Sequence, residues 1–181
     1  MQENIYESSK NYGIIGNLHT TALVSNKGSI DWLCLPDLDS GSVFAKILDK
    51  DKGGFFEICP VEDFKGEQKY IEKTNILETR FIFQDNRKVI ITDFMPPKNQ
   101  IKKDDSTILI RKVECIKGTV LVRITFNPRT DYGKHNPEYK KEESMLTAQD
   151  SNSTLALRSD IDMHHTDNIY TEELVLKEGN V

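Results

Sequence analysis

The amino-acid sequence predicts a mainly β protein, folded as an antiparallel β-sandwich with one short helix near residues 42–49. Short apolar runs recur at regular spacing, and turn residues such as glycine, asparagine and aspartate separate them. Residues 119–126 alternate between apolar and mixed side chains with a period of two, which is typical of a strand with one fully buried face. Many short strands with almost no helical periodicity favour two packed sheets.

The first third of the chain predicts a hairpin, a helix and a strand, in that order. Residues 22–25 and 29–35 are apolar runs separated by Asn26-Lys27-Gly28, a sequence that suits a hairpin turn. A proline closes the second run, after which Asp39 or Ser40 is placed to cap a helix with apolar residues at 43, 44, 47 and 48. Two glycines then end the helix and release a strand over residues 55–59.

The remainder of the chain predicts strands throughout. Two turns stand out, Gln84-Asp85-Asn86 and Lys117-Gly118, and each lies between two apolar runs. Residues 99–105 form a polar loop between strands. The predicted strands in this part cover residues 70–72, 76–83, 88–94, 107–116, 119–126, 144–148, 154–158 and 172–176.

Composition argues against several classes of function. At 181 residues the chain has the size of one domain. Its net charge of −5 and pI near 5.4 argue against a nucleic-acid partner, since phosphate binding needs clustered lysine and arginine. No apolar stretch reaches the roughly 20 residues of a membrane-spanning helix, and the polar first residues carry no signal-peptide core. We therefore expect a soluble, cytoplasmic protein with no membrane partner.

The cysteines and histidines do not support a metal or cofactor site. Cys34, Cys59 and Cys115 each lie in a strand-like apolar run, which favours free thiols in a reducing compartment. No two cysteines have the spacing of metal ligands. His164 and His165 are adjacent, so their side chains diverge on a strand. The sequence predicts no metal and no cofactor.

Five sequence blocks carry a resemblance to a known family, and the strongest begins with GSIDWLCLP at residues 28–36. In their order the blocks resemble the N-terminal domain of bacterial and archaeal glucoamylases and trehalase-like enzymes of glycoside hydrolase family 15. They span nearly the whole chain. The matching residues are Ile15-Gly16, Thr20, Ala22-Leu23-Val24, residues 28–36, Asp39-Ser40, Val43-Phe44-Ala45, Gly53-Gly54, Pro60, and residues 74–79, 92–96, 128–133 and 155–160.

The resemblance implies that residues 1–181 are a supersandwich-like N-terminal domain of a longer glycoside hydrolase. It implies that a further strand, a linker and a helical (α/α)-barrel catalytic domain follow, and that the paired catalytic glutamates belong to the barrel. No residue of this chain matches those glutamates. We therefore expect a truncated, inactive domain whose partner is its own catalytic domain, with trehalose or an α-glucan bound through that domain.

Two positions depart from the family pattern. Asp37 stands where the family usually has arginine, and Gly41 stands where it usually has proline. The first change reverses a charge in a loop that we expect to face a partner.

Acidic residues are the candidate catalysts, because glycosidic hydrolysis needs a proton donor and a second carboxylate. The candidates are Asp31, Asp37, Asp39, Asp93 and Asp131. Several have a structural alternative: a helix cap at Asp39, a strand end at Asp93 and a turn at Asp131. The sequence places no second acid opposite any of them. We predict no catalytic residue in this chain.

Two loops, residues 32–40 and 129–133, are predicted to contact the substrate or the catalytic domain. A lone tryptophan on a strand is more often core than ligand platform, and Arg129 with Asp131 suits a turn-stabilising pair equally well. The alternative function is a stand-alone carbohydrate-binding or oligomerisation module, although the chain has one tryptophan for a sugar platform. The contact candidates are Trp32, Asp37, Asp39, Arg129, Asp131 and Tyr132.

Overall fold

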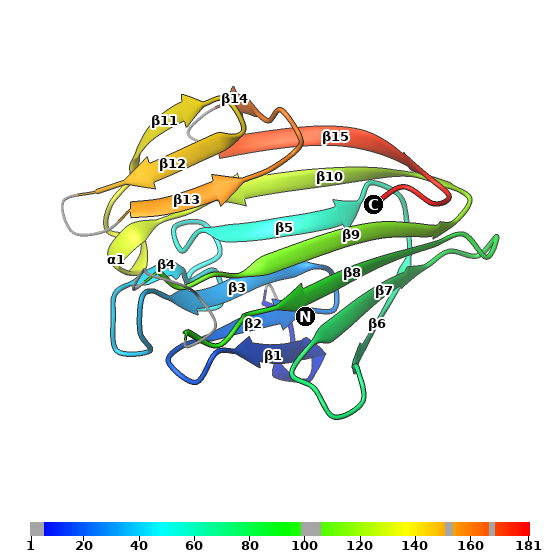
Figure 1. Ribbon diagram of the computed structural model, residues 1–181, viewed down its shortest axis with the longest axis horizontal. Coiled ribbons are helices and arrows are strands. Elements are labelled where there is room, and N and C mark those ends of the chain that lie inside the picture. Colours follow the sequence, from blue (N-terminus) through cyan, green and yellow to red (C-terminus); the bar gives the residue numbers. More distant parts are fainter. Residues whose placement is uncertain (1–5, 99–105, 151–153, 167–168) are drawn as a thin grey trace, which may run out of the picture.

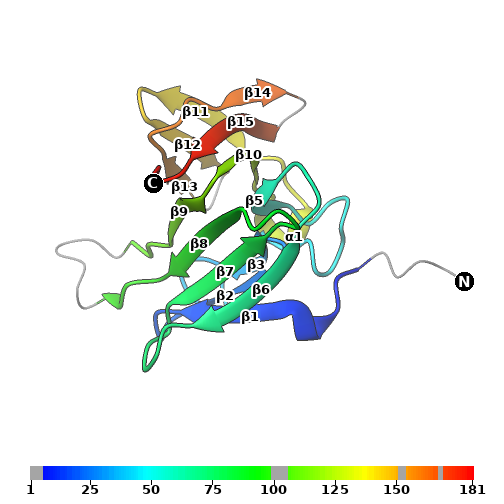
Figure 2. The same ribbon diagram turned by 90° about the vertical axis from the view of Figure 1, so that its right-hand side faces the viewer.

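A computed structural model describes residues 6–98, 106–150, 154–166 and 169–181, which form two layers of antiparallel β-sheet (Figure 1). The larger layer is an eight-stranded sheet in the order β1-β2-β3-β5-β10-β15-β14, with β4 paired to β3. The second layer holds two smaller sheets, β6-β7-β8-β9 and β11-β12-β13, on one face of the larger sheet (Figure 2). The predicted mainly β, antiparallel sandwich is confirmed.

The strands of the larger sheet are β1 (Tyr12–Gly16), β2 (Thr21–Ser25), β3 (Ser29–Cys34), β4 (Ser42–Phe44), β5 (Phe55–Pro60), β10 (Thr119–Asn127), β14 (His164–Thr166) and β15 (Ile169–Lys177). The second layer consists of β6 (Lys65–Tyr70), β7 (Leu77–Ile82), β8 (Lys88–Phe94), β9 (Ile110–Lys117), β11 (Glu138–Glu142), β12 (Met145–Gln149) and β13 (Thr154–Arg158). Short helical turns occur at η1 (Ser9–Asn11) and α1 (Thr130–Gly133).

Most predicted strands lie within a few residues of the observed ones, and β8 has the predicted bounds. The prediction for residues 70–72 was wrong, because β6 ends at Tyr70 and a turn follows. The sequence pattern also missed β1, β4, β11 and β14. Of these, β11 and β14 are mostly exposed and polar, so they have no apolar alternation to detect. The predicted polar loop at 99–105 lies outside the described residues.

The helix predicted near residues 42–49 is wrong. Ser42 and Phe44 pair with β3 as the short strand β4, and Phe44 packs edge-on against Phe126 with ring centroids 6.2 Å apart. Leu48, which the helical pattern placed in the core, is 60 % exposed. The chain after β4 makes a compact loop instead, in which the Asp49 carboxylate accepts hydrogen bonds from the backbone amides of Asp51 and Lys52. Packing of the aromatic ring against the sheet therefore overrides the local helical spacing.

The hairpin between β2 and β3 confirms the turn predicted from Asn26-Lys27-Gly28. Gly28 has a φ of +86°, a left-handed conformation that glycine adopts without strain. A Cβ atom at this position would lie 2.2 Å from the carbonyl oxygen of Ile58, so the turn has no room for any side chain at residue 28. The close approach brings the hairpin against β5, and Arg111 from the other layer donates hydrogen bonds to both the hairpin turn and β5.

Arg111 on β9 is a buried clamp between the two layers. Its Nε lies 2.8 Å from Asp93 Oδ1 on β8, and the side chains of Arg111 and Asp93 are 3 % and 0 % exposed. Its remaining nitrogens donate to the carbonyl oxygens of Phe56 and Gly28, each at 2.7 Å. The guanidinium also stacks over the Phe56 ring, 4.8 Å from the centroid. Arg111 therefore joins β8 and β9 to the larger sheet.

The larger sheet supplies much of the core. β10 alternates buried residues with more exposed ones, as the period-two pattern predicted.

None of the helices in the described parts of the chain has the length and apolar character of a membrane span. The three cysteines are free thiols: Cys34 and Cys115 are buried, and Cys59 is partly buried.

Candidate functional site

The fold brings the two predicted contact loops together, although they are about a hundred residues apart in sequence. The rings of Trp32 and Tyr132 lie with centroids 6.2 Å apart and planes tilted by 42°. The backbone N–H of Tyr132 donates to Ser42 Oγ at 3.0 Å, which ties the second loop to β4. Trp32 is partly buried and Tyr132 is 46 % exposed. These two rings form one partly exposed aromatic surface.

The second loop holds an unusual left-handed turn. Asp131, Tyr132 and Gly133 have φ values of +48°, +60° and +79° in succession. Left-handed backbone costs roughly 1–2 kcal/mol per residue other than glycine, so the surrounding contacts must hold Asp131 and Tyr132 in place. A Cβ at Gly133 would lie 2.5 Å from the carbonyl oxygen of Lys52. The turn therefore aims the Tyr132 ring at Trp32.

Asp131 lies in a turn, as the sequence suggested, and its carboxylate pairs with Lys134 Nζ at 3.0 Å. Burial raises the pKa of the Tyr139 phenol, and the charge of Arg129, which is hydrogen-bonded to it, opposes that shift in part. Two buried atoms beside the turn, Asn127 Oδ1 and Thr130 Oγ1, have no hydrogen-bond partner among the described residues.

Asp31 lies on the opposite side of β3 from Trp32 and is only 4 % exposed. Its carboxylate accepts hydrogen bonds from Tyr12 Oη at 2.6 Å and from Ser29 Oγ at 2.5 Å. Lys46 Nζ lies 3.8 Å away. Burial and the neighbouring carboxylate raise the pKa of Tyr12, which therefore stays a neutral donor. These contacts give Asp31 a structural role and separate it from the aromatic surface.

The other candidate acids do not meet at a common point either. Asp93 is buried inside the sandwich near the end of β8, where burial raises its pKa and Arg111 opposes that shift. Asp37 lies in the first loop, 3.0 Å from Lys98 and 3.4 Å from His19. Asp39 is exposed and caps no helix, because none forms there. The geometry supports no pair of carboxylates on opposite sides of a sugar.

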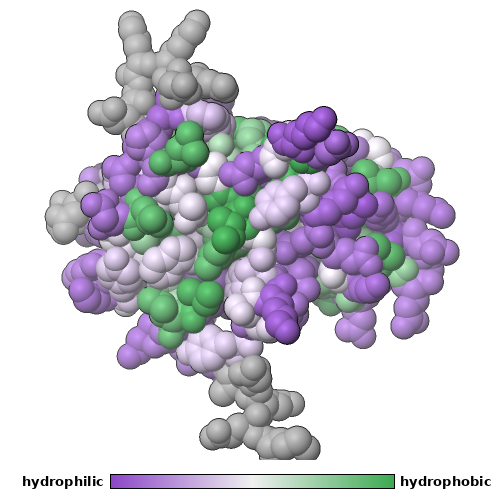
Figure 3. Space-filling model, turned by 90° about the horizontal axis from the view of Figure 1, so that it is seen from below, coloured by the Kyte–Doolittle hydropathy of each residue, from purple (hydrophilic) through white to green (hydrophobic). Residues whose placement is uncertain are grey.

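Exposed apolar side chains lie in the first loop and next to it. Leu38 is 57 % exposed and its N–H donates to the carbonyl oxygen of His19 at 3.0 Å. The neighbouring Leu18 is 99 % exposed. Figure 3 views the molecule from the side of β1 and shows apolar side chains scattered among polar ones on that face. Sequence patterning missed this feature, because single leucines in loops have no period to detect.

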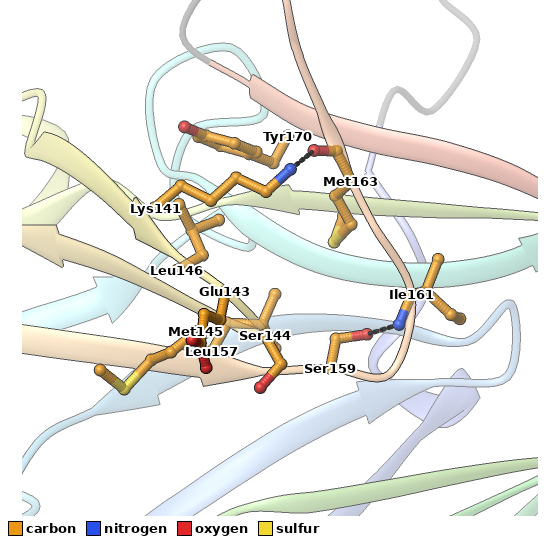
Figure 4. Close-up of a pocket in the computed structure, with 10 residues that line it drawn as sticks. All are labelled: Lys141, Glu143, Ser144, Met145, Leu146, Leu157, Ser159, Ile161, Met163 and Tyr170. Atoms are coloured by element: carbon orange, nitrogen blue, oxygen red, sulfur yellow. Dashed lines mark hydrogen bonds between the residues drawn. The ribbon is translucent and has the colours of Figure 1, made fainter.

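A cavity between β12, β13 and the segment before β14 is too small to bind a substrate (Figure 4). Its volume is about 20 Å³, close to the space that one water molecule needs. Lys141 closes one side by donating to the carbonyl oxygen of Met163 at 2.9 Å. Within the parts of the chain that the structure describes, no group of three or more acidic, histidine or cysteine side chains is placed to hold a metal ion.

Comparison with known proteins identifies the family. A family model described as "Trehalase-like, N-terminal" matches residues 8–172. A trehalase of Thermoplasma volcanium is 39 % identical over 142 residues, which are 76 % of this chain and 22 % of the relative. Trehalase 1 of Sulfolobus acidocaldarius is 38 % identical over 155 residues, 84 % of this chain and 25 % of the relative. A Mycobacterium tuberculosis trehalase is 29 % identical over 143 residues, 71 % of this chain and 21 % of the relative.

The chain thus spans about a fifth to a quarter of the length of these relatives. No solved structure matches it. The match to the family model covers most of the chain and includes both contact loops, and it agrees with the sequence blocks that surround Trp32 and Tyr132. This chain belongs to the family of trehalase-like N-terminal domains.

Proposed function

We propose that this chain is the non-catalytic N-terminal domain of a trehalase-like glycoside hydrolase and that it packs on and supports the catalytic barrel. The observation that carries the proposal is the aromatic surface of Trp32 and Tyr132, which two distant loops build together. The left-handed backbone at Asp131 and Tyr132 supports it further, since strained backbone of this kind gathers at functional sites. Exposed leucines beside the first loop add apolar area of the kind that interfaces cover.

The substrate of the whole enzyme, in this proposal, is trehalose or a related α-glucoside, bound through the catalytic domain. The relatives at 38–39 % identity are named trehalases, which favours trehalose over longer glucans. The separated carboxylates support a domain that does no chemistry itself. Free cysteines fit a cytoplasmic enzyme.

The first test is hydrolysis by the 181-residue protein alone. We expect no glucose release from trehalose or from maltose, because the acids are buried, ion-paired or isolated. Sugar release that survives purification and disappears on substitution of one aspartate of this chain would contradict the proposal.

The second test uses the T. volcanium trehalase with this chain in place of its own matching segment. Trp32→Ala and Tyr132→Ala should each lower kcat/KM by roughly tenfold, which corresponds to about 1.4 kcal/mol of lost transition-state stabilisation. The free energy of unfolding should change by less than this amount. Val175→Ala, on an exposed residue of β15, is the matched control. If both aromatic variants lose only thermal stability and keep their kinetics, the surface is ordinary packing.

The aromatic surface also favours one alternative, a carbohydrate-binding module, because partly exposed rings stack on the apolar faces of sugars. Isothermal titration of the isolated chain with trehalose, maltose and longer glucans separates the two functions. Saturable binding that Trp32→Ala removes would favour the alternative. An absence of binding, together with the kinetic effect above, would favour the supporting role.

A further inference from the structure

The strand that carries Trp32 is interrupted by one extra residue, Asp31. Across the ladder between β2 and β3, Val24 pairs with Ile30. The next pair is Leu23 with Trp32, so the pairing skips Asp31. This arrangement is a β-bulge, which bends its strand and redirects the side chains beside it. The direction of the Trp32 ring therefore depends on how Asp31 is held.

On its other side, β3 changes its neighbouring strand at the same point. It pairs with β5 through Ser29 and Ile30, and with β4 from Leu33 onward. Asp31 and Trp32 lie between these two stretches. The ladders on that side of the strand do not hold this short segment, so its conformation depends on other contacts.

The carboxylate of Asp31 makes contacts with three parts of the chain. It accepts hydrogen bonds from Tyr12 Oη on β1 at 2.6 Å and from Ser29 Oγ on β3 at 2.5 Å. Lys46 Nζ, in the loop after β4, lies 3.8 Å away. The side chain of Asp31 is only 6 % exposed, and hydrogen bonds to a carboxylate are stronger than those between neutral groups. The carboxylate therefore ties the bulge to β1 and to that loop.

The loop after β4 also holds the backbone of Asp31. The N–H of Ile47 donates to the carbonyl oxygen of Asp31 at 3.2 Å. Lys46 is fixed in turn, because its Nζ lies 3.6 Å from Glu57 Oε2 and 4.1 Å from the centroid of the Phe55 ring. Two consecutive residues of one loop thus contact the side chain and the backbone of the extra residue.

The ring that neighbours Trp32 is anchored to a later part of the same strand. Ser42 pairs with Cys34 of β3, and its Oγ accepts from the N–H of Tyr132 at 3.0 Å. Tyr132 is therefore positioned relative to the end of β3, and Trp32 relative to the bulge at Asp31. The distance of 6.2 Å between the two ring centroids depends on the backbone of β3 between these points.

We propose that Asp31 is a positioning residue for the aromatic surface of Trp32 and Tyr132. It acts through the backbone of the bulge: its carboxylate fixes the extra residue, and the fixed bulge directs the Trp32 ring toward Tyr132. This role needs no contact between Asp31 and a substrate or the catalytic domain. The purpose of the surface rests on the proposed function, whereas the positioning of the rings is a property of this chain alone.

The test uses the fluorescence and near-ultraviolet circular dichroism of the 181-residue protein, in which Trp32 is the only tryptophan. In the otherwise wild-type protein, Tyr132→Leu should change both spectra, because it removes the neighbouring ring. In Asp31→Ala, the same substitution should have less than about half of that effect, since residues that act through one contact are not additive.

A second variant tests the same contact more mildly, and serves alone if Asp31→Ala fails to fold. Tyr12→Phe removes one donor to the carboxylate from another strand, so it should also reduce the effect of Tyr132→Leu. Tyr70→Phe is the matched control. It likewise removes a tyrosine hydroxyl that bonds to a neighbouring strand, but its partner is the backbone of Ile14. The effect of Tyr132→Leu should remain as in the wild type.

A reduced ring effect in Asp31→Ala and Tyr12→Phe, with the wild-type effect in Tyr70→Phe, supports the proposal. The wild-type effect in all variants, accompanied only by lower stability in urea, would overturn it and leave Asp31 a purely structural residue. An equal reduction in Tyr70→Phe would overturn it as well, since any loss of stability would then separate the rings.

Kinetics separate this inference from the proposed function. In the T. volcanium trehalase that carries this chain, Asp31→Ala should lower kcat/KM by roughly tenfold, as Trp32→Ala does, and the double variant should lose no more. If the spectra change as expected while all these variants keep the wild-type kcat/KM, the proposed function is wrong and the positioning of the rings stands.

Discussion

Two edges of the sandwich differ in how the outward-facing backbone groups are hydrogen-bonded. At the edge formed by β1, side chains from the second layer satisfy the outward-facing backbone. Tyr70 Oη accepts from the N–H of Ile14 at 2.8 Å and donates to its carbonyl oxygen at 2.9 Å. Asn75 Nδ2 donates to the carbonyl oxygen of Gly16 at 3.0 Å. Figure 2 shows the β6–β7 hairpin that supplies both residues beside β1.

At the groove between β9 and β13, two edges face each other over apolar side chains, and among the described residues only the 179–180 segment pairs with that side of β9. Natural sheets usually block an exposed edge, since an open one recruits other strands. The comparison teaches that specific side chains cover the edge at β1, whereas the outer side of β9 pairs with the backbone of residues 179 and 180.

The largest effect is expected where β9 is held in place, at Arg111. Substitution Arg111→Met removes the partner of a fully buried carboxylate and should destabilise the protein by about 3–5 kcal/mol. The loss should also loosen β9 and widen the groove, because the same side chain bonds to the backbone of Phe56 and Gly28. Urea unfolding followed by tryptophan fluorescence measures the change.

A double variant controls for the lost charge. Arg111→Met combined with Asp93→Leu leaves no isolated carboxylate in the core, so it should recover a large part of the stability lost in the single variant. A single variant that costs less than about 1 kcal/mol would contradict the view that this clamp joins the layers.

A smaller effect is expected at the protected edge. Tyr70→Phe removes one hydroxyl that serves both backbone groups of Ile14 and should cost about 0.5–1.5 kcal/mol. The amide of Ile14 should exchange faster with solvent, and the variant should self-associate more at high concentration, since the edge of β1 becomes available. NMR exchange and analytical ultracentrifugation measure both effects.

Tyr6→Phe is the matched control, because the Tyr6 hydroxyl makes only a long, exposed contact of 3.5 Å with the carbonyl oxygen of Leu48. Unchanged exchange at Ile14 in Tyr70→Phe would mean that solvent replaces the hydroxyl fully and that the protection of this edge has another source.

Sequence patterns predicted individual strands and turns, but they did not predict the contacts that distinguish the two edges. Alternation along residues 119–126 and the hairpin at Gly28 are local patterns, so they predicted β10 and the β2–β3 turn. The Tyr70 and Asn75 hydrogen bonds join residues more than 50 positions apart in sequence, and no local pattern specifies such pairs. The groove is likewise a product of strand order, since β9 and β13 face each other only after the larger sheet has formed.

For the candidate site, too, the sequence indicated individual residues but not the contacts between them. Motif resemblance singled out Trp32 and Tyr132 separately, and the structure adds their contact. The helix prediction near residues 42–49 failed because the apolar spacing of Val43, Phe44, Ile47 and Leu48 suits a helix, whereas Phe44 packs with Phe126 as part of a strand. The sequence indicated a turn at Asp131, but it could not indicate that Asp131 and Tyr132 share the left-handed backbone of Gly133.

The smallest effect is expected from pH, in the loop that lies near the protected edge. The hydrogen bond from Lys98, with a smaller contribution from His19, holds the pKa of Asp37 below its ordinary value of 3.8. A carboxyl group whose pKa is lower in the folded state stabilises that state above its unfolded pKa, and the contribution is lost as pH falls through the folded value.

Thermal unfolding between about pH 2 and pH 6 measures this contribution. As the pH falls, the unfolding temperature should decrease slightly more steeply for the wild type than for Asp37→Asn. Asp39→Asn, which removes a carboxylate from the same loop, is the matched control for the change in charge. Identical slopes for all three proteins would show that solvent screens the Asp37 contacts completely and that they do not help to fix this loop.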